Sequence, residues 1–182
     1  MTDYVLSKLP IEVKLNEEEV KKSVNFIRRL QEDKQKHGVT DRMFDRNNTS
    51  SGINQVGHLG EVAVGKVLGL PVDYKIRTGG DEGFDLRLNR ATIQVKTTST
   101  QTASLIFNAK HLFSADIAIL VQFVGADKKQ SEKDPRFKIW GWCTRSHFMS
   151  SYYNHDYGYG MRLVLDSENL WSLDSLLEEH GV

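Results

Sequence analysis

Residues 79–99, with the sequence GGDEGFDLRLNRATIQVKTTS, constrain the fold of this chain more than any other stretch. Segments 84–88 and 91–98 each alternate apolar and polar residues with a period of two, which is typical of a β-strand that buries one face. Asn89 and Arg90 separate the two segments and predict a two-residue turn. The sequence therefore predicts an antiparallel hairpin.

The register of this hairpin decides which side chains share a face. Residues directly opposite each other in an antiparallel pair lie on one face, with Cβ atoms about 5 Å apart. A two-residue turn pairs Leu88 with Ala91 and therefore sets Asp85 opposite Gln94. Lys96 lies two residues beyond Gln94 and points to the same side. This polar face gathers Asp85, Gln94 and Lys96, whereas the other face is apolar and consists of Phe84, Leu86, Leu88, Ala91, Ile93 and Val95.

The polar face has the composition of a metal-dependent hydrolytic site. A carboxylate and an amide oxygen on adjacent strands can share one hard divalent cation, and a lysine beside them can orient or deprotonate a water. Phosphodiester hydrolysis needs these groups. An ordinary amphipathic hairpin also carries mixed charges on its wet face, so the surrounding chain has to decide between the two interpretations. Asp81 and Glu82 would replace Asp85 as acidic ligands if the register slipped by one residue.

The hairpin resembles that of the PD-(D/E)XK nucleases, in the variant where glutamine replaces the second acid. Asp85 corresponds to the first acid and residues 94–96 (QVK) correspond to the (D/E/Q)XK tripeptide. Mrr-type restriction enzymes and related phage nucleases share this pattern. The resemblance extends over residues 57–148, about half of the chain. It implies a restriction-endonuclease-like α/β fold, in which helices flank a mixed central sheet.

A helix predicted over residues 55–70 supplies a fourth candidate. Its apolar residues recur at helical spacing, and its glycines at 57, 60, 65 and 69 favour close packing, here against the sheet. Residues 57–61 (GHLGE) resemble the first helix of the nuclease fold, whose glutamate reaches the metal site. Taken alone, Glu61 is interpreted as a surface acid of the helix. Taken together with Asp85, Gln94 and Lys96, it favours a role in the metal site. His58 is interpreted as structural.

The resemblance also implies the cofactor and the role of each residue. Asp85, Gln94 and the Val95 carbonyl would bind Mg²⁺, with Mn²⁺ as a substitute. Glu61 would complete the coordination shell directly or through a water. Lys96 would position the attacking water and balance the developing charge.

Five further residues are candidates for nucleic-acid contacts. Thr97 and Thr98 follow the tripeptide and can donate to phosphate. Arg46 lies in a polar segment over 40–53 that is either a phosphate-contacting loop or an ordinary connection, and Arg77 precedes the Gly79-Gly80 turn. Tyr153 belongs to a tyrosine-rich loop over 152–160, which can stack on bases or fasten itself to the core.

The remaining elements are predicted from periodicity and capping signals. A helix over 17–37 begins with a capping box of Asn16 and Glu19 and ends at Gly38. Residues 116–124 (DIAILVQFV) predict a strand buried on both faces. The other predictions are strands over 71–76, 104–107 and 137–143, an edge strand over 161–165, a charged loop over 126–135, a helix over 144–150 and a last helix capped by Ser172.

Composition sets the outer limits of function. Lys plus Arg and Asp plus Glu both count 24 in 182 residues, so a binding surface for DNA has to be local. Cys143 is the sole cysteine, and no long apolar run is present, which indicates an intracellular, cytoplasmic protein without a membrane segment, compatible with a phage-encoded origin. The length favours a single domain over 1–182, with the N-terminal helix preceding a core at about 55–165.

The sequence therefore predicts a metal-dependent endonuclease that hydrolyses DNA, with a homodimer as a possible assembly. Two alternatives come from other classes. One is a non-catalytic module on the same fold that binds nucleic acid or a partner, and the other is a small-molecule enzyme that uses the carboxylates as acid and base.

Overall fold

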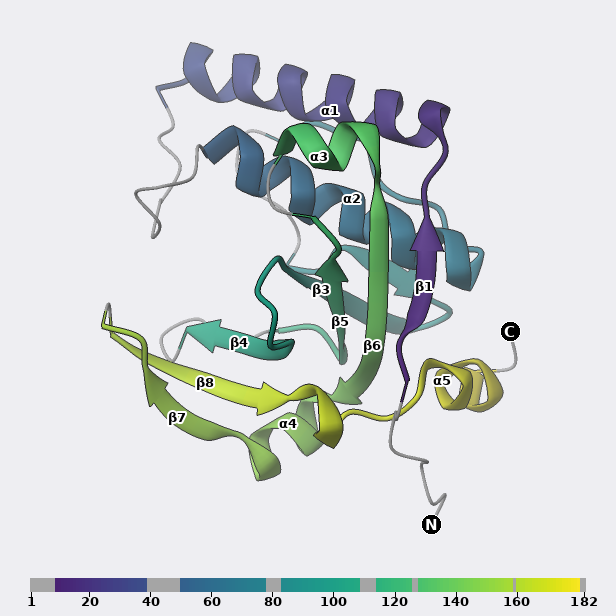
Figure 1. The fold of residues 1–182 in the computed structure, drawn as a ribbon, viewed down its shortest axis with the longest axis vertical. Helices are drawn as coiled ribbons and strands as arrows, with labels where there is room; N and C mark the ends of the chain where they lie inside the picture. Colours follow the sequence, from purple (N-terminus) through teal and green to yellow (C-terminus); the bar gives the residue numbers. More distant parts are fainter. Residues whose placement is uncertain are drawn as a thin grey trace.

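The larger of two β-sheets lies at the centre of the molecule, with helices α1 (Glu17–Lys36) and α2 (Ser50–Leu68) on one side and the smaller sheet on the other (Figure 1). The computed structural model describes residues 9–38, 50–77, 83–108, 114–125, 128–158 and 160–180. The larger sheet has the order β1-β6-β5-β3-β2, in which β3 and β5 run parallel and every other pair is antiparallel. Its strands are β1 (Ile11–Lys14), β2 (Leu86–Leu88), β3 (Ala91–Thr98), β5 (Ile117–Phe123) and β6 (Arg136–Thr144). The fold is therefore mixed α/β, as the sequence predicts.

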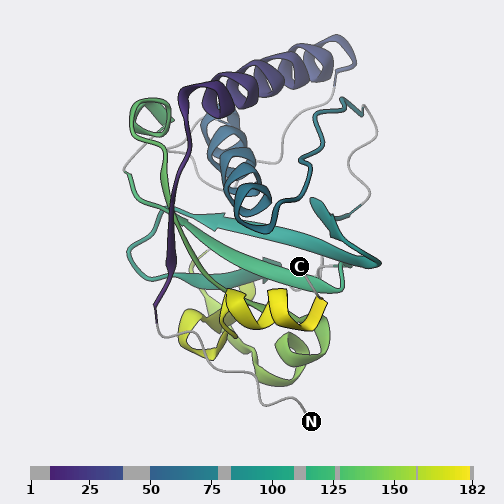
Figure 2. The same ribbon diagram turned by 90° about the vertical axis from the view of Figure 1, so that its right-hand side faces the viewer.

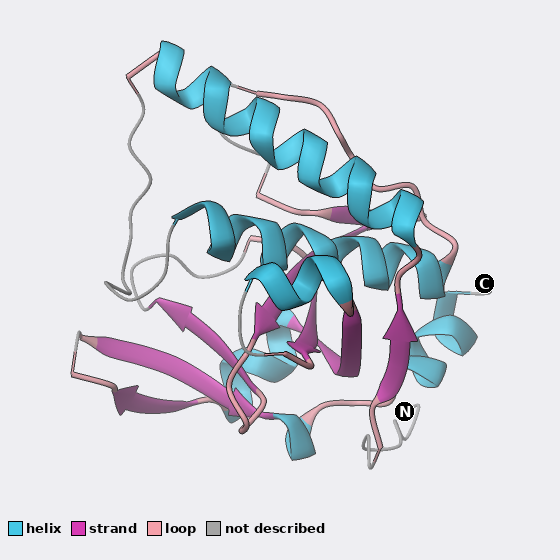
Figure 3. Ribbon diagram, turned by 45° about the horizontal axis from the view of Figure 1, so that its top comes forward, coloured by secondary structure: helices cyan, strands magenta, loops and turns pink. Residues whose placement is uncertain are grey.

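The smaller sheet is antiparallel and has the order β4-β8-β7 (Figure 3). Its strands are β4 (Ser104–Asn108), β7 (Tyr153–Asp156) and β8 (Met161–Asp166). The α-helices are α1 (Glu17–Lys36), α2 (Ser50–Leu68), α3 (Lys128–Lys133), α4 (Arg145–Ser151) and α5 (Leu173–His180), and a 3₁₀ turn spans Ser167–Asn169. None of the helices in the described ranges combines the length and apolar character needed to cross a membrane.

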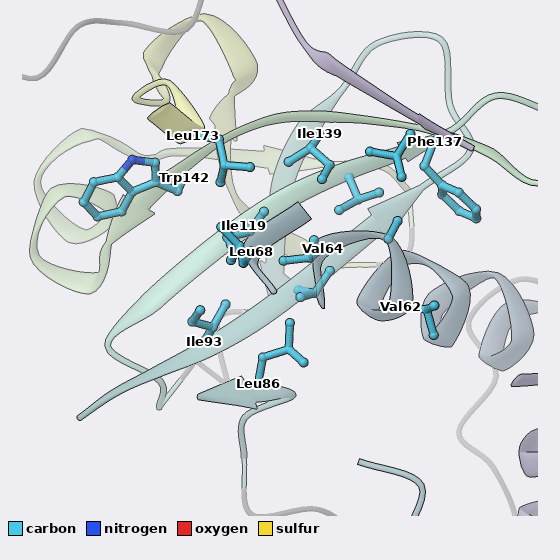
Figure 4. Packing of buried hydrophobic residues seen from close by; sticks show 14 of the residues in the cluster. Val62, Val64, Leu68, Leu86, Ile93, Ile119, Phe137, Ile139, Trp142 and Leu173 are labelled. Atoms are coloured by element: carbon cyan, nitrogen blue, oxygen red, sulfur yellow. The ribbon is translucent and has the colours of Figure 1, made fainter. Parts of the chain in front are cut away.

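The larger sheet separates two hydrophobic cores. On one face, α2 packs between the sheet and α1 (Figure 2), and its Val64 and Leu68 join Leu86, Ile93 and Ile119 in one buried cluster (Figure 4). On the other face, the smaller sheet and α4 supply a second cluster. Strand β5 contributes side chains to both clusters. Its odd-numbered residues from 117 to 123 belong to the first cluster, and Ala118 and Leu120 belong to the second. The prediction of a strand buried on both faces is confirmed.

Helix α1 begins and ends where its capping signals predict. Asn16 Oδ1 accepts from the Glu19 amide at 2.9 Å, and Glu19 Oε2 accepts from the Asn16 amide at 2.7 Å. Gly38 follows the helix with φ +67°, a conformation that glycine adopts without steric cost.

Helix α2 begins at Ser50 rather than at residue 55, so the predicted loop is wrong at residues 50–53. Tertiary contacts explain the extra turn, because the Gln55 side chain is buried and donates to Ser131 Oγ and Glu132 Oε1 of α3. The same contacts explain why 128–133 is a helix and not a charged loop, since Ser131 is fully buried against α2.

The strand predicted over 71–76 is absent. Val72 and Tyr74 are half-buried and pack against the first core, while their neighbours Pro71, Asp73 and Lys75 are exposed. The alternation is therefore present, but it reflects side chains packed on a helical layer, and the segment pairs with no strand in the described part of the chain.

Residues 153–156 of the tyrosine-rich segment form strand β7, whereas the sequence predicts a loop, and 161–165 is not an edge strand. Asp156 Oδ1 accepts from the amides of Gly158 and Gly160, which have positive φ angles. Strand β8 lies in the middle of the smaller sheet, with β7 at its edge. Strand β1, which pairs with β6, has no counterpart in the predictions.

Candidate active site

The hairpin has the predicted register from Leu86 to Ile93. Asp85 does not pair with Gln94 as predicted, because it lies ahead of β2 and its amide meets Ile93 instead. Leu86 pairs with Ile93 and Leu88 with Ala91, and Asn89 turns the chain with φ 53°. Asp85 precedes β2, and its amide donates to the Ile93 carbonyl at 2.8 Å. Its carboxylate Oδ2 accepts from the Val95 amide at 2.7 Å. Asp85 therefore lies beside β3, at the point where β2 has not yet begun.

One residue of the predicted apolar face is on the other side. Leu86, Leu88, Ile93 and Val95 are buried in the core under α2, and Ala91 packs against it. Phe84 instead packs against the second core, beneath the Arg87 guanidinium at 4.7 Å from its ring. Gly83 has φ +83° and β2 starts only at Leu86, so the strand alternation does not extend back to Phe84. In the sequence, the glycine before the strand is the one signal for this break in the alternation.

Gln94 presents an unsatisfied oxygen to the site. Its Oε1 is buried and has no hydrogen-bond partner. A buried polar atom without a partner costs about 1–3 kcal/mol. Gln94 directly precedes Val95, whose amide binds the Asp85 carboxylate, and an amide oxygen of this kind is suited to a hard cation.

The Val95 carbonyl completes this arrangement. Backbone groups of residues two apart in a strand point to the same side. The Ile93 carbonyl and the Val95 amide both meet Asp85, so the Val95 carbonyl points to the same edge of β3. The donor set is all oxygen, as Mg²⁺ prefers. In the described part of the chain no three His, Cys, Asp or Glu residues cluster to hold a metal, so a cation here depends on these amide and carbonyl oxygens.

Helix α2 packs closely on β3 and carries Glu61. A Cβ on Gly60 would collide with the Thr97 hydroxyl, and the Gly57 carbonyl accepts from that hydroxyl at 3.5 Å. Glu61 follows Gly60 and is half-buried. Burial, followed by the charges of Glu19 and Glu61, raises the pKa of Tyr74, so Glu61 lies near that ring. Helix α2 covers the sheet face opposite Lys96.

Lys96 is half-buried on the face of β3 that meets the smaller sheet. Its Nζ lies over the ring of Phe107 in β4, 5.2 Å from the centroid. Phe107 is buried and meets Phe148 edge-on, with centroids 5.0 Å apart. The lysine cation therefore lies above an aromatic platform that belongs to the second core.

Among the described candidates for nucleic-acid contacts, Thr97, Thr98 and Tyr153 do not share one face. Thr98 shares the face of Lys96, whereas Thr97 points toward α2. Arg77 Nη1 donates to Asp73 Oδ2 at 2.6 Å. Tyr153 pairs with Val164, which pairs with Ile106, so it lies on the face of the smaller sheet opposite Phe107 and Lys96. Arg46 lies outside the described residues, as do the alternative acids Asp81 and Glu82.

His58 has the structural surroundings that the sequence analysis expects. It is buried between α1 and α2, its Nδ1 is 2.7 Å from the Ser23 hydroxyl, and its ring contacts Phe26 and Tyr74. Burial lowers the pKa of His58 to about 4, although the nearby Asp73 backbone opposes the shift. That backbone group does not form a full hydrogen bond with the buried Nε2.

Comparison of the chain with protein-family models, with curated proteins and with solved structures finds no match in any of the three.

Proposed function

We propose that this protein is a metal-dependent endonuclease that hydrolyses DNA phosphodiester bonds. One observation carries the proposal: the Asp85 carboxylate is anchored to the β3 backbone beside Gln94, whose buried Oε1 has no partner. The resemblance of the hairpin to the glutamine variant of PD-(D/E)XK nucleases supports it. A mixed sheet with a parallel β3–β5 pair, covered by helices, accords with a restriction-endonuclease-like fold.

The residues divide the work of hydrolysis among them. Asp85, Gln94 and the Val95 carbonyl would hold Mg²⁺, or Mn²⁺ in its place, with Glu61 as a further direct or water-mediated ligand. The bound ion supplies Lewis acidity and a water of lowered pKa. Lys96 orients the attacking water and balances the negative charge that develops on the phosphate.

The proposed substrate and setting follow from local features. The chain has a formal net charge of zero, so DNA would be bound by cations near the hairpin and not by a general positive field. The sole cysteine, Cys143, is a buried free thiol, which accords with an intracellular setting. A homodimer remains a prediction.

Cleavage assays test this function directly. Purified protein is incubated with supercoiled, linear and branched DNA in Mg²⁺, Mn²⁺ or EDTA, alongside Asp85→Asn. Asparagine keeps an acceptor for the Val95 amide and removes the charge. We expect metal-dependent cleavage that the variant loses while its melting temperature in EDTA changes little. DNA binding without cleavage under every metal condition would instead favour the non-catalytic module, and cleavage by Asp85→Asn at the wild-type rate would remove Asp85 from the site.

A further inference from the structure

Arg87 lies on the polar face of the hairpin but has no part in the site described above. It is exposed, sits opposite Thr92 and follows Asp85 by two residues in the chain. Two residues of chain span at most about 7 Å between Cα atoms. The backbone of Arg87 is therefore close to that of the residue proposed to hold the metal.

The break in alternation at Phe84 gives Arg87 a platform. Because Phe84 turns toward the second core, its half-buried ring lies beneath the guanidinium, 4.7 Å from the centroid. Stacking on an aromatic face is worth about 0.5–1 kcal/mol at exposed sites and restricts a flexible side chain. The planar fork of an arginine held in this way is ready to donate two parallel hydrogen bonds to a phosphate.

Arg87 forms no ion pair in the described part of the chain, although its charge acts on Asp116. The Oδ2 of Asp116 already accepts from the Thr92 amide and hydroxyl, both at 2.8 Å. The pKa of Asp116 is lowered mainly by these two hydrogen bonds and to a lesser extent by the charge of Arg87. The ionised Asp116 partly offsets the positive charge of Arg87, so Arg87 would act on a phosphate mainly through directional hydrogen bonds.

Two cations of the hairpin are backed by aromatic rings. Lys96, two residues after Gln94, lies over Phe107, and Arg87, two residues after Asp85, lies over Phe84. The Cα atoms of Asp85 and Arg87 lie within about 7 Å of each other, a separation comparable with that of neighbouring phosphates along one nucleic-acid strand. We propose that Arg87 binds the backbone phosphate adjacent to the one that is cleaved, an inference that rests on the proposed nuclease function and extends it to how the strand is held.

The first test uses binding, so it does not depend on cleavage. In the Asp85→Asn background, Arg87→Gln should weaken affinity for duplex DNA about tenfold and reduce the slope of log affinity against log salt by about one. Arg90→Gln, at the exposed hairpin tip, is the matched control and should change affinity much less. Arg87→Lys should restore the salt slope but not the full affinity, because it keeps the charge and loses the fork.

The second test locates the phosphate. Once wild-type cleavage has been mapped, a neutral methylphosphonate is placed on either side of the cleaved bond. Only one of these positions should weaken wild-type binding strongly, and Arg87→Gln should be insensitive to the same substitution. Additive losses at both positions, or equal effects of Arg87→Gln and Arg90→Gln, would overturn the inference while leaving nuclease activity intact. Absence of cleavage by the wild type would instead count against the proposed function, and absence of DNA binding against both.

Discussion

At the residue scale, the Gln94 side chain is expected to lower the stability of the metal-free protein and to serve as a ligand when the metal is bound. Its buried, partnerless Oε1 costs free energy in the metal-free protein. Gln94→Leu should therefore leave the free energy of unfolding in EDTA unchanged or raise it by up to about 1 kcal/mol, while abolishing the gain in melting temperature that Mg²⁺ produces. Urea unfolding and thermal melts with and without Mg²⁺ measure both. A marked loss of stability in EDTA would mean that the amide has a structural role instead.

The reverse substitution tests the metal more directly. Gln94→Glu adds a negative charge beside Asp85, so the free enzyme should bind Mg²⁺ more tightly, and the variant should be less stable than wild type in EDTA because two carboxylates then adjoin. Calorimetric titration with Mg²⁺ reads the affinity. Equal or weaker affinity in a folded variant would exclude Gln94 from the coordination shell.

His58 makes a separate prediction about pH. Its pKa is lowered to about 4 in the folded protein, whereas in the unfolded chain it is about 6.5. As pH falls below 6.5 the unfolded state takes up the proton first, so stability is full above that pH and is lost as pH falls toward 4. The loss from this residue should reach about 2 kcal/mol at pH 5.

Urea unfolding of wild type and His58→Phe at pH 7.5 and pH 5 isolates this contribution. Phenylalanine keeps the contacts with Phe26 and Tyr74 and cannot titrate. The variant should show a smaller drop between the two pH values, whatever its absolute stability. If the free energy of unfolding falls equally in the two proteins, folding does not lower the pKa of His58.

At the element scale, α2 and β3 are held at a distance set by glycine. Alanine for glycine inside a helix normally gains up to about 1 kcal/mol, and Gly57→Ala should do so because a Cβ there meets nothing within 4 Å. Gly60→Ala should be destabilising, since its Cβ meets the hydroxyl, Cβ and Cγ2 of Thr97. Chemical denaturation of the pair compares two identical changes one turn apart. Thr97→Ala should rescue Gly60→Ala, and a stable Gly60→Ala single variant would refute this packing argument.

An element can be predicted from the sequence when residues close to it in the chain specify its hydrogen bonds, and not when its backbone partners come from distant segments. The hairpin, α1 and β5 are predictable because a short turn, a capping box and a continuous apolar run specify each of them locally. Residues 71–76 alternate like a strand, yet the chain contains nothing that says whether a partner backbone will lie beside them. In the site, Gln94 and Lys96 follow from the alternation of β3, whereas the position of Asp85 ahead of β2, the turning of Phe84 and the platform under Arg87 depend on Gly83 and the second core.

At the scale of the whole molecule, the candidate site lies where the two cores meet at one edge of the larger sheet. Helix α2, which carries Glu61, packs on the first core, and the smaller sheet places Phe107 of the second core under Lys96. The smaller sheet therefore supports the proposed catalytic lysine without contributing a reacting group. We expect this supporting role of the smaller sheet to be visible as a difference in cleavage rate between two substitutions in the second core.

Phe107 and Phe148 supply that comparison, because both are buried in the second core and touch each other edge-on. Leucine at either position should cost stability, about 1–2 kcal/mol each, through smaller volume and the lost ring pair. Only Phe107→Leu removes the face beneath the Lys96 ammonium, an interaction worth about 0.5–2 kcal/mol, so only that variant should lower the cleavage rate at saturating DNA, by roughly threefold to tenfold. Denaturation curves and single-turnover rates, both taken well below each melting temperature, separate the two effects. Equal rates in the two variants would mean that the ring under Lys96 is packing alone.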